Sequence, residues 1–118
     1  METILEWTPR LGALLTILIG AAGFFKPTVI TDGCDIALNS NKAISESRAV
    51  FGGLNLGWGL TALITGNPTV FLALGCAWGL ATAARFFSMV ADGSTIQESI
   101  PPIVIDGTIA LLSLTILL

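Results

Sequence analysis

Two ionisable side chains, Arg85 and Asp106, lie inside long apolar stretches of the sequence. A charge at the centre of a bilayer costs about 2.5–3.5 kcal/mol on insertion scales, so each of them is expected to find a partner. Arg85 precedes Asp92 and Asp106 follows Pro101, in two segments that a short polar connection joins. Antiparallel helices on either side of that connection would place both charges about 10 Å below the same interface. We therefore predict an ion pair between Arg85 and Asp106.

A polar layer is expected around this pair. Asn55 reaches about the same depth on a preceding helix, by the same rise per residue, and is predicted to complete the pair. The candidate site residues in this layer, or above it toward the loops, are Glu46, Arg48, Asn55, Arg85, Asp92 and Asp106, and Glu98 is also expected above the layer. Two functional roles stay open, because intramembrane ionisable groups often mark transport paths. Arg85 could bind the carboxylate of a substrate, and Asp106 could transfer protons.

The residue types needed for several other chemistries are missing. The chain has no histidine, no tyrosine and only two cysteines, so nucleophilic triads and zinc hydrolysis lack their usual parts. Cys34 and Cys76 are expected to be free thiols, and Cys76 a small packing residue. Five scattered basic residues in a chain of net charge -3 cannot form the basic patch that a nucleic-acid backbone needs. We predict no catalytic residue, no metal, no cofactor and no nucleic-acid partner.

Small and polar residues form a stripe on the helix expected over 45–65. Its members, at helical spacing, are Arg48, Gly52, Asn55, Gly59 and Ala62. Such a stripe favours a close helix interface, since association in lipid relies on tight packing, and a polar cavity wall is the alternative. Phe51 and Trp58, beside the stripe, and Trp78 are candidates for an apolar wall around a ligand.

The composition indicates an integral membrane protein. Of the 118 residues 53% are hydrophobic and only 11% charged, with a mean hydropathy of +0.86. Apolar periodicity and turn residues predict helices at about 7–26, 45–65, 68–91 and 97–118, with an extramembrane loop over 27–44. Gly66-Asn67-Pro68 is the predicted turn between the second and third helices. The expected architecture is a single transmembrane domain over 1–118, an all-α four-helix antiparallel bundle.

One segment resembles a known family. Residues 45–54 read Ser-Glu-Ser-Arg-Ala-Val-Phe-Gly-Gly-Leu, and Gly57, Gly59, Arg85 and Asp92-Gly93 follow. Together they resemble a bacterial family of small four-helix membrane proteins, domain of unknown function 4345. The resemblance covers nearly the whole chain and implies a bacterial inner membrane, but no established reaction. The family commonly has tyrosine where this chain has Phe51, so a role that needs a phenol is not expected here.

Basic residues predict the orientation of the chain in the membrane. Lys26, Lys42 and Arg48 flank the loop over 27–44, against Arg10 alone at the opposite end. By the positive-inside rule, 27–44 and 92–98 are expected in the cytoplasm and both termini outside.

Three functions follow from these features. The first is a non-enzymatic accessory or scaffold subunit, packed in a homo-oligomer or a larger membrane complex. The alternative is a binder or carrier of a small lipophilic or anionic ligand, with positive charge from Arg48 and Arg85. A proton-linked transporter that uses Asp106 is a third possibility.

Overall fold

The computed structural model describes residues 2–118, which are almost entirely helical, with no strand among them. In chain order the elements are α1 (Glu2–Phe25), α2 (Thr28–Gly33), α3 (Asn41–Ser47), the π-helix η1 (Arg48–Gly53), α4 (Leu54–Thr65), α5 (Pro68–Ala91), α6 (Ile96–Leu114) and the 3-10 turn η2 (Thr115–Leu117). The backbone stays right-handed helical at both ends of η1, so 41–65 is one unbroken helical segment. The predicted all-α class is confirmed.

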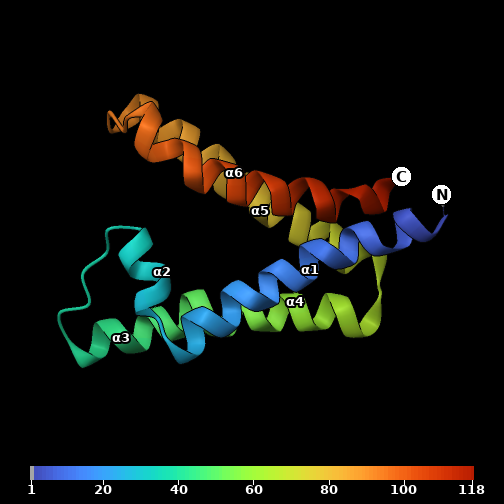
Figure 1. The fold of residues 1–118 in the computed structure, drawn as a ribbon, viewed down its shortest axis with the longest axis horizontal. Helices are drawn as coiled ribbons and strands as arrows, with labels where there is room; N and C mark the ends of the chain where they lie inside the picture. Colours follow the sequence, from blue (N-terminus) through green and yellow to red (C-terminus); the bar gives the residue numbers. More distant parts are fainter. Residues whose placement is uncertain (1) are drawn as a thin grey trace.

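The long helices form two pairs that meet at one end (Figure 1). Helix α1 lies against η1 and α4, and α5 lies against α6. Neighbouring helices run in opposite directions, and the two termini lie at the end where the pairs meet (Figure 1). The pairs diverge toward the other end, where α2 and α3 lie beside the α1–α4 pair. The molecule is therefore V-shaped, with a closed end and an open end.

Local sequence signals explain where the helices end. Gly66 ends α4 in the left-handed region, at φ 62°, which glycine adopts without a steric cost. The Asn67 side chain accepts a hydrogen bond from the Thr69 amide at 2.9 Å, and Pro68 starts α5, so the predicted turn is present. At the other hairpin, the side chains of Thr95 and Glu98 form a capping box at the start of α6.

Glycines let α1 cross η1 and α4 at backbone distance. A Cβ placed on Gly52 would lie 2.5 Å from the backbone of Phe24, and one on Gly23 would lie 2.7 Å from the carbonyl carbon of Phe51. A Cβ on Gly59 would lie 2.7 Å from the Ile17 side chain. No real side chain fits at such distances, so the small-residue stripe on 45–65 forms the close helix interface that the sequence favours, and its partner is α1.

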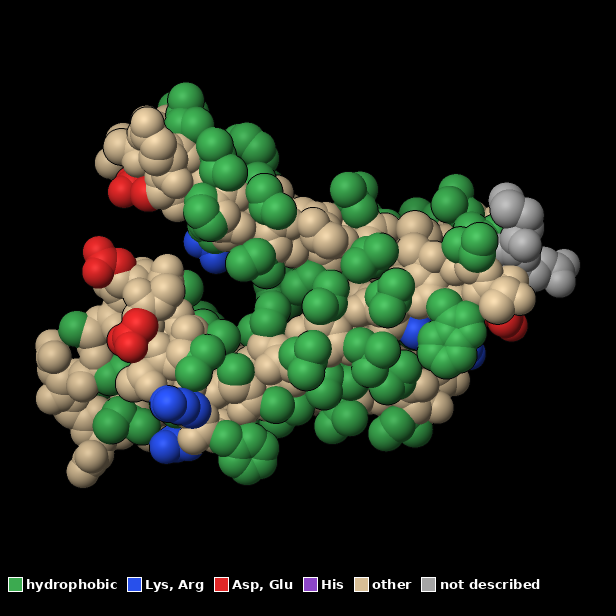
Figure 2. Space-filling view, in the orientation of Figure 1, with side chains coloured by type: hydrophobic (Ala, Val, Ile, Leu, Met, Phe, Trp, Pro, Cys, Tyr) green, Lys and Arg blue, Asp and Glu red, His purple; other side chains and the backbone are tan. Residues whose placement is uncertain are grey.

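The core fills the closed end of the V. Its fully buried members are Ala13, Ala62, Phe71 and Leu74. Elsewhere large apolar side chains cover the outer surface of the helices (Figure 2). Phe87 and Val90 on α5 and Leu111 on α6 are among the most exposed. Side chains of this kind suit contact with lipid, and they agree with the membrane protein that the composition predicts.

The expected four-helix bundle is confirmed only in part, and the expected loop over 27–44 needs correction. Three helices are long and apolar enough to cross a membrane: Thr3–Phe25, Pro68–Ala91 and Ile96–Leu117. The fourth expected span is divided into α3, η1 and α4, none of which is long enough alone, so a bundle of four spans is not confirmed. The segment expected as a loop, 27–44, contains the short helix α2, which follows Pro27, and the start of α3. The structure thus supports a membrane protein with three candidate spans.

Candidate functional site

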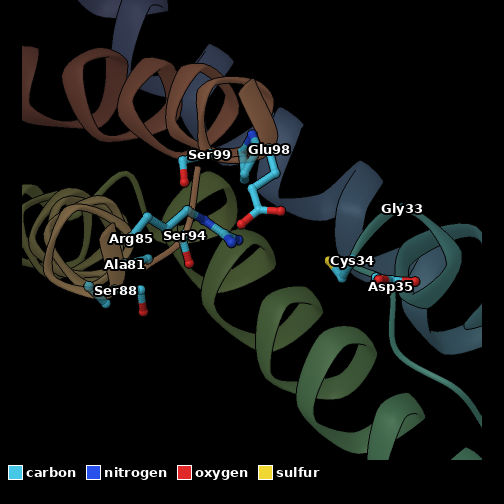
Figure 3. Close-up of a pocket in the computed structure, with 11 residues that line it drawn as sticks. Gly33, Cys34, Asp35, Ala81, Arg85, Ser88, Ser94, Glu98 and Ser99 are labelled. Carbon is cyan, nitrogen blue, oxygen red and sulfur yellow. The ribbon is translucent and has the colours of Figure 1, made fainter. Parts of the chain in front are cut away.

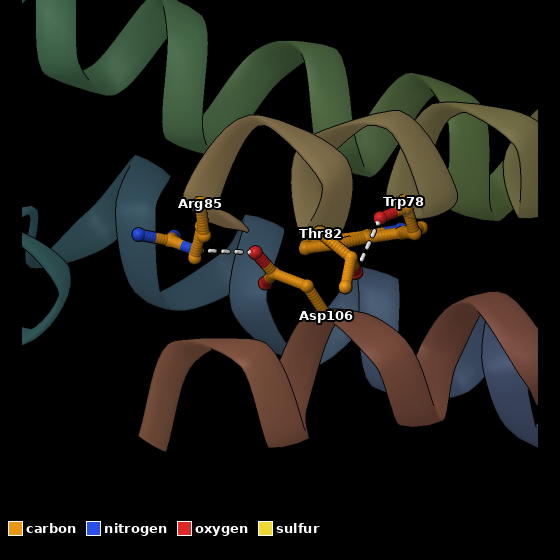
Figure 4. A network of polar contacts seen from close by, with 4 residues as sticks. All are labelled: Trp78, Thr82, Arg85 and Asp106. Atoms are coloured by element: carbon orange, nitrogen blue, oxygen red, sulfur yellow. Dashed lines mark hydrogen bonds and ion pairs between the residues drawn. The ribbon is translucent and has the colours of Figure 1, made fainter. Parts of the chain in front are cut away.

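Arg85 and Asp106 form the predicted ion pair. Arg85 extends from α5 into the gap between the two helix pairs (Figure 3), and its Nε donates a hydrogen bond to Oδ2 of Asp106 on α6 at 2.7 Å (Figure 4). The Asp106 side chain is only 5% exposed, whereas that of Arg85 is 38% exposed. In the described chain, Nε is the only side-chain nitrogen of Arg85 with a hydrogen-bond partner, and the terminal nitrogens point into the gap. The pair therefore holds the guanidinium in place and leaves its outer edge free.

A second polar contact fixes Trp78 below the ion pair. The indole Nε1 of Trp78 donates to the hydroxyl of Thr16 on α1 at 3.0 Å. Thr16 is fully buried and donates in turn to the Gly12 carbonyl at 2.8 Å. The Thr82 hydroxyl donates to the Trp78 carbonyl one turn away, at 2.9 Å (Figure 4). The Trp78–Thr16 bond joins α5 to α1 at a point where both helix pairs are still in contact.

The open end of the V holds a cavity with two adjoining sections. The outer section measures about 590 Å³. It is lined by Gly33, Cys34, Asp35, Ala81, Ala84, Arg85, Ser88, Ser94, Glu98, Ser99 and Pro102. Much of this lining is polar, and Arg85 is the only basic residue in it among residues 2–118 (Figure 3).

The inner section is mostly apolar and measures about 520 Å³. It is lined by Ile19, Val29, Ile30, Gly33, Cys34, Val50, Phe51, Leu54, Asn55, Trp58, Leu74, Ala77, Trp78, Ala81, Arg85, Pro101, Pro102, Ile105 and Asp106. Arg85, Cys34 and Pro102 line both sections, so the two are continuous. Several inner residues, such as Val29, Leu54 and Ile105, are more than half exposed, so the inner section opens to the surroundings of the helices. Both volumes lie within the range typical of small-molecule sites.

The structure brings six of the nine predicted site residues together. These six line the inner section: Asn55, Arg85 and Asp106, with the predicted apolar wall of Phe51, Trp58 and Trp78. Asn55 does not complete the ion pair, however. Its Nδ2 donates to the Phe51 carbonyl of its own helical segment at 2.8 Å. The Asn55 side chain therefore bonds a backbone carbonyl and not the carboxylate of Asp106.

The other three predicted residues lie outside the cavity lining. Nη1 of Arg48 donates to the carbonyls of Phe24 and Phe25 and so caps the C-terminal end of α1, which has no basic residue of its own in its last turn. Glu46 is exposed on α3, and Asp92 is the exposed residue that follows α5. Arg48 is therefore a structural cap, not a second ligand-binding cation.

The predicted site residues did not include two charged residues of the outer section, although Glu98 was expected above the polar layer, toward the loops. Glu98 is in the first turn of α6, where the Thr95 capping box places it at the cavity opening. The signal was present, since a threonine three residues before a glutamate marks a helix start. Asp35 follows α2 in a segment expected as loop, and no sequence pattern indicates that this segment folds back over the gap.

The two cysteines are free, as predicted, but they differ from expectation in position. Cys34 lines the cavity, and Cys76 lies on the exposed side of α5 and is not a packing residue in this chain. Within residues 2–118, no group of three potential ligands could hold a metal ion.

A family model decides the affiliation of the chain. The model for a domain of unknown function, DUF4345, matches residues 4–117. The chain belongs to this family. The match confirms the resemblance seen in residues 45–59, 85 and 92–93, and it extends over α1 and α6 as well. No curated protein and no solved structure matches the chain. DUF4345 carries no assigned activity, so the function must be argued from the cavity itself.

Proposed function

We propose that the protein binds one amphipathic molecule with an acidic head group, as a non-enzymatic binder or carrier in the membrane. The acidic group would lie against the terminal nitrogens of Arg85 in the outer section, and the apolar chain would fill the inner section. One observation carries this proposal. Asp106 holds Nε of Arg85 at 2.7 Å, while the remaining donors face a polar space that continues into an apolar one.

The chemistry of Arg85 supports an anionic partner. A guanidinium has five N–H donors, of which Asp106 uses one, and its planar edge matches carboxylate and phosphate groups. Hydrogen bonds between such charged groups are worth about 1.5–3 kcal/mol each, which is ample to select an acidic head group. The adjoining Phe51, Trp58 and Trp78 offer the apolar surface that an acyl chain requires.

The arrangement in the membrane is part of the same proposal. We propose that 41–65 is a fourth crossing, because α4 packs along α1, which is itself a candidate span. The chain carries no charge from Ala49 to Ala84, so this part can lie in lipid. We place the protein in a bacterial inner membrane, with the cavity opening and the segments 27–44 and 92–98 on the cytoplasmic side. A ligand would then enter sideways from the bilayer.

The accessory or scaffold role remains a weaker proposal. It rested on small-residue stripes that could pack against another chain. Gly20, Gly23, Gly52 and Gly59 instead pack within this chain, whereas Gly57 and Gly79 have no neighbour within 4 Å of a Cβ and are the members that still favour a partner chain. Proton transfer by Asp106 is supported less, because the carboxylate is engaged by Arg85 and nearly buried.

Tryptophan fluorescence in detergent micelles tests the proposal. A Trp7→Phe background leaves Trp58 and Trp78, both of which line the cavity. Phosphatidic acid with brominated acyl chains should quench them saturably, and the unbrominated lipid should reverse the quenching. Arg85→Gln with Asp106→Asn removes both charges together and should weaken binding about tenfold or more, since 1.4 kcal/mol is a factor of ten.

Arg10→Gln is the matched control in the same background, because Arg10 lies beside residue 7 at the closed end, away from the cavity. It should bind like the parent. Quenching that rises without saturation, or that is the same in the double variant, would contradict the proposed function.

A further inference from the structure

We propose that the cavity selects a zwitterionic head group, a phosphate linked to a primary ammonium, over a purely anionic one. This inference rests on the proposed function and names its ligand class. The phosphate would lie on Arg85, and the ammonium would lie between Asp35 and Glu98 at the cavity opening. The known lipid class with this chemistry is a phosphatidylethanolamine.

The charges around the outer section carry the first step. Asp106 already neutralises Arg85, and the outer section adds the carboxylates of Asp35 and Glu98. A ligand with only negative charge would gain Arg85 but would also face two carboxylates without compensation. An ammonium beside the phosphate supplies that compensation, so the head group as a whole matches the lining.

The two carboxylates come from opposite sides of the gap. Asp35 follows α2 and belongs to the α1–α4 side, whereas Glu98 belongs to α6 (Figure 3). Figure 2 shows acidic side chains on both arms at the opening of the V. A cationic group between them would relieve the repulsion and connect the two arms. Arg85 lies deeper in the cavity than Asp35 and Glu98, because it lines both sections and they line only the outer one. A head group with its phosphate inside and its ammonium outside therefore matches the positions of these charges.

Glu98 has the capacity to accept another donor. Its Oε1 accepts from the Thr95 amide at 2.8 Å, and a carboxylate has about four acceptor sites in all. Pro101 and Pro102 lie inside α6 and have no amide hydrogen, so the carbonyls of Gln97 and Glu98 lack their usual helical donors. The first turns of α6 therefore offer acceptors for a primary ammonium.

The outer section favours a primary over a quaternary ammonium. Quaternary groups such as choline are bound by aromatic cages, and no aromatic residue lines the outer section of the described chain. A primary ammonium donates three hydrogen bonds, which match the carboxylates and carbonyls present. Ser88, Ser94 and Ser99 add hydroxyl groups that can donate to the phosphate.

Competition with head-group variants tests this inference. The quenched Trp7→Phe protein with bound brominated phosphatidic acid is titrated with unbrominated lipids that share one set of acyl chains. Phosphatidylethanolamine should displace the probe at about fivefold lower concentration than phosphatidylglycerol or phosphatidylcholine, the change expected of one partly exposed ion pair. Equal or better displacement by phosphatidylglycerol overturns the charge argument. Equal displacement by phosphatidylcholine overturns the choice of a primary ammonium.

Carboxylate variants provide the second arm. Glu98→Gln keeps a capping side chain at the third helical position, and Asp35→Asn lies in a connection between helices, so both should fold. Each should reduce the ethanolamine preference to below about twofold without weakening phosphatidylglycerol, because each removes one ion pair. Glu46→Gln, an exposed change outside the cavity, is the matched control and should keep the full preference. An undiminished preference in both cavity variants would also overturn the inference, whereas absence of saturable binding by the brominated probe refutes the proposed function itself.

Discussion

Arg85 has two roles in this structure: its Nε pairs with Asp106, and the rest of its guanidinium faces the cavity. A buried ion pair often adds little net stability, because the desolvation of both groups offsets their attraction. Its value here is geometric. Asp106, almost fully buried, fixes Nε and thereby the plane of the guanidinium, and the exposed remainder of Arg85 is presented to the cavity in one orientation. Such preorganisation reduces the entropy lost when a ligand binds.

The two members of the pair should respond unequally to substitution. Arg85→Met leaves a buried carboxylate without compensation and should lower the unfolding free energy by about 3–5 kcal/mol. Asp106→Leu leaves an arginine that is 38% exposed and can reach polar surroundings, so its cost should be smaller. The double variant should recover most of the loss, with a coupling of about 1–3 kcal/mol. Reversible unfolding in mixed micelles, followed by tryptophan fluorescence, measures all four proteins.

Lys42→Met, a change of the same kind on exposed α3, is the reference for the loss of a surface charge. Single effects no larger than this reference, and additive in the double variant, would show that the pair contributes no coupling.

The sequence predicted the ion pair but not the partner of Asn55. Matched depth follows from the rise per residue and from the position of the hairpin, both of which are visible in the sequence. Asn55 follows the π-helical turn η1, and its side chain donates to the carbonyl of Phe51 within that turn. A π turn changes the register of the following side chains by a fraction of a turn. No pattern of residue types in 45–55 reveals that shift.

At the scale of elements, the crossing of α1 with η1 and α4 is a close contact that the sequence indicated. The small-residue stripe on 45–65 predicted an interface correctly, and Gly12, Thr16, Gly20 and Gly23 form a similar series on α1. The sequence could not show whether the partner is in the same chain or in another copy. The same packing physics governs both cases, and only the fold of the hairpins decides between them.

Alanine substitutions separate the interface glycines from the outward ones. Gly52→Ala should lower the unfolding free energy by about 1–3 kcal/mol, because its Cβ would meet the Phe24 backbone at 2.5 Å and the helices must move apart. Gly57→Ala, on the same helical segment, is the matched control, since nothing lies within 4 Å of its Cβ. It should be neutral or stabilise by up to about 1 kcal/mol through helix propensity. The same unfolding assay in micelles reports both. If the two substitutions had equal effects, the described crossing of α1 and η1 would be wrong.

At the scale of the whole molecule, the divergence of the two helix pairs is the feature that the sequence did not predict. Composition, turn residues and periodicity predict helices and their order, and they led to a closed bundle. In water, exposed apolar walls such as those of the inner section would collapse on one another. In lipid no such force operates, because acyl chains solvate apolar side chains as well as other side chains do. A V-shaped molecule whose gap is filled by lipid would therefore be stable in a bilayer, and its opening angle would depend on packing at the closed end around Ala13, Phe71 and Leu74.

The orientation of this V determines which leaflet can supply the ligand. Lys26, Lys42 and Arg48 lie at or near the open end, against Arg10 near the closed end, so the open end should face the cytoplasm. Cys34 lies at the cavity opening and is exposed. In intact cells, with Cys76→Ala as background, it should be protected from a membrane-impermeant maleimide and should react in inverted membrane vesicles. A second protein with Cys34→Ser and Leu118→Cys should show the reverse pattern, because the C-terminus lies at the opposite end (Figure 1). Labelling of Cys34 from outside intact cells would invert the topology and would assign the ligand to the outer leaflet.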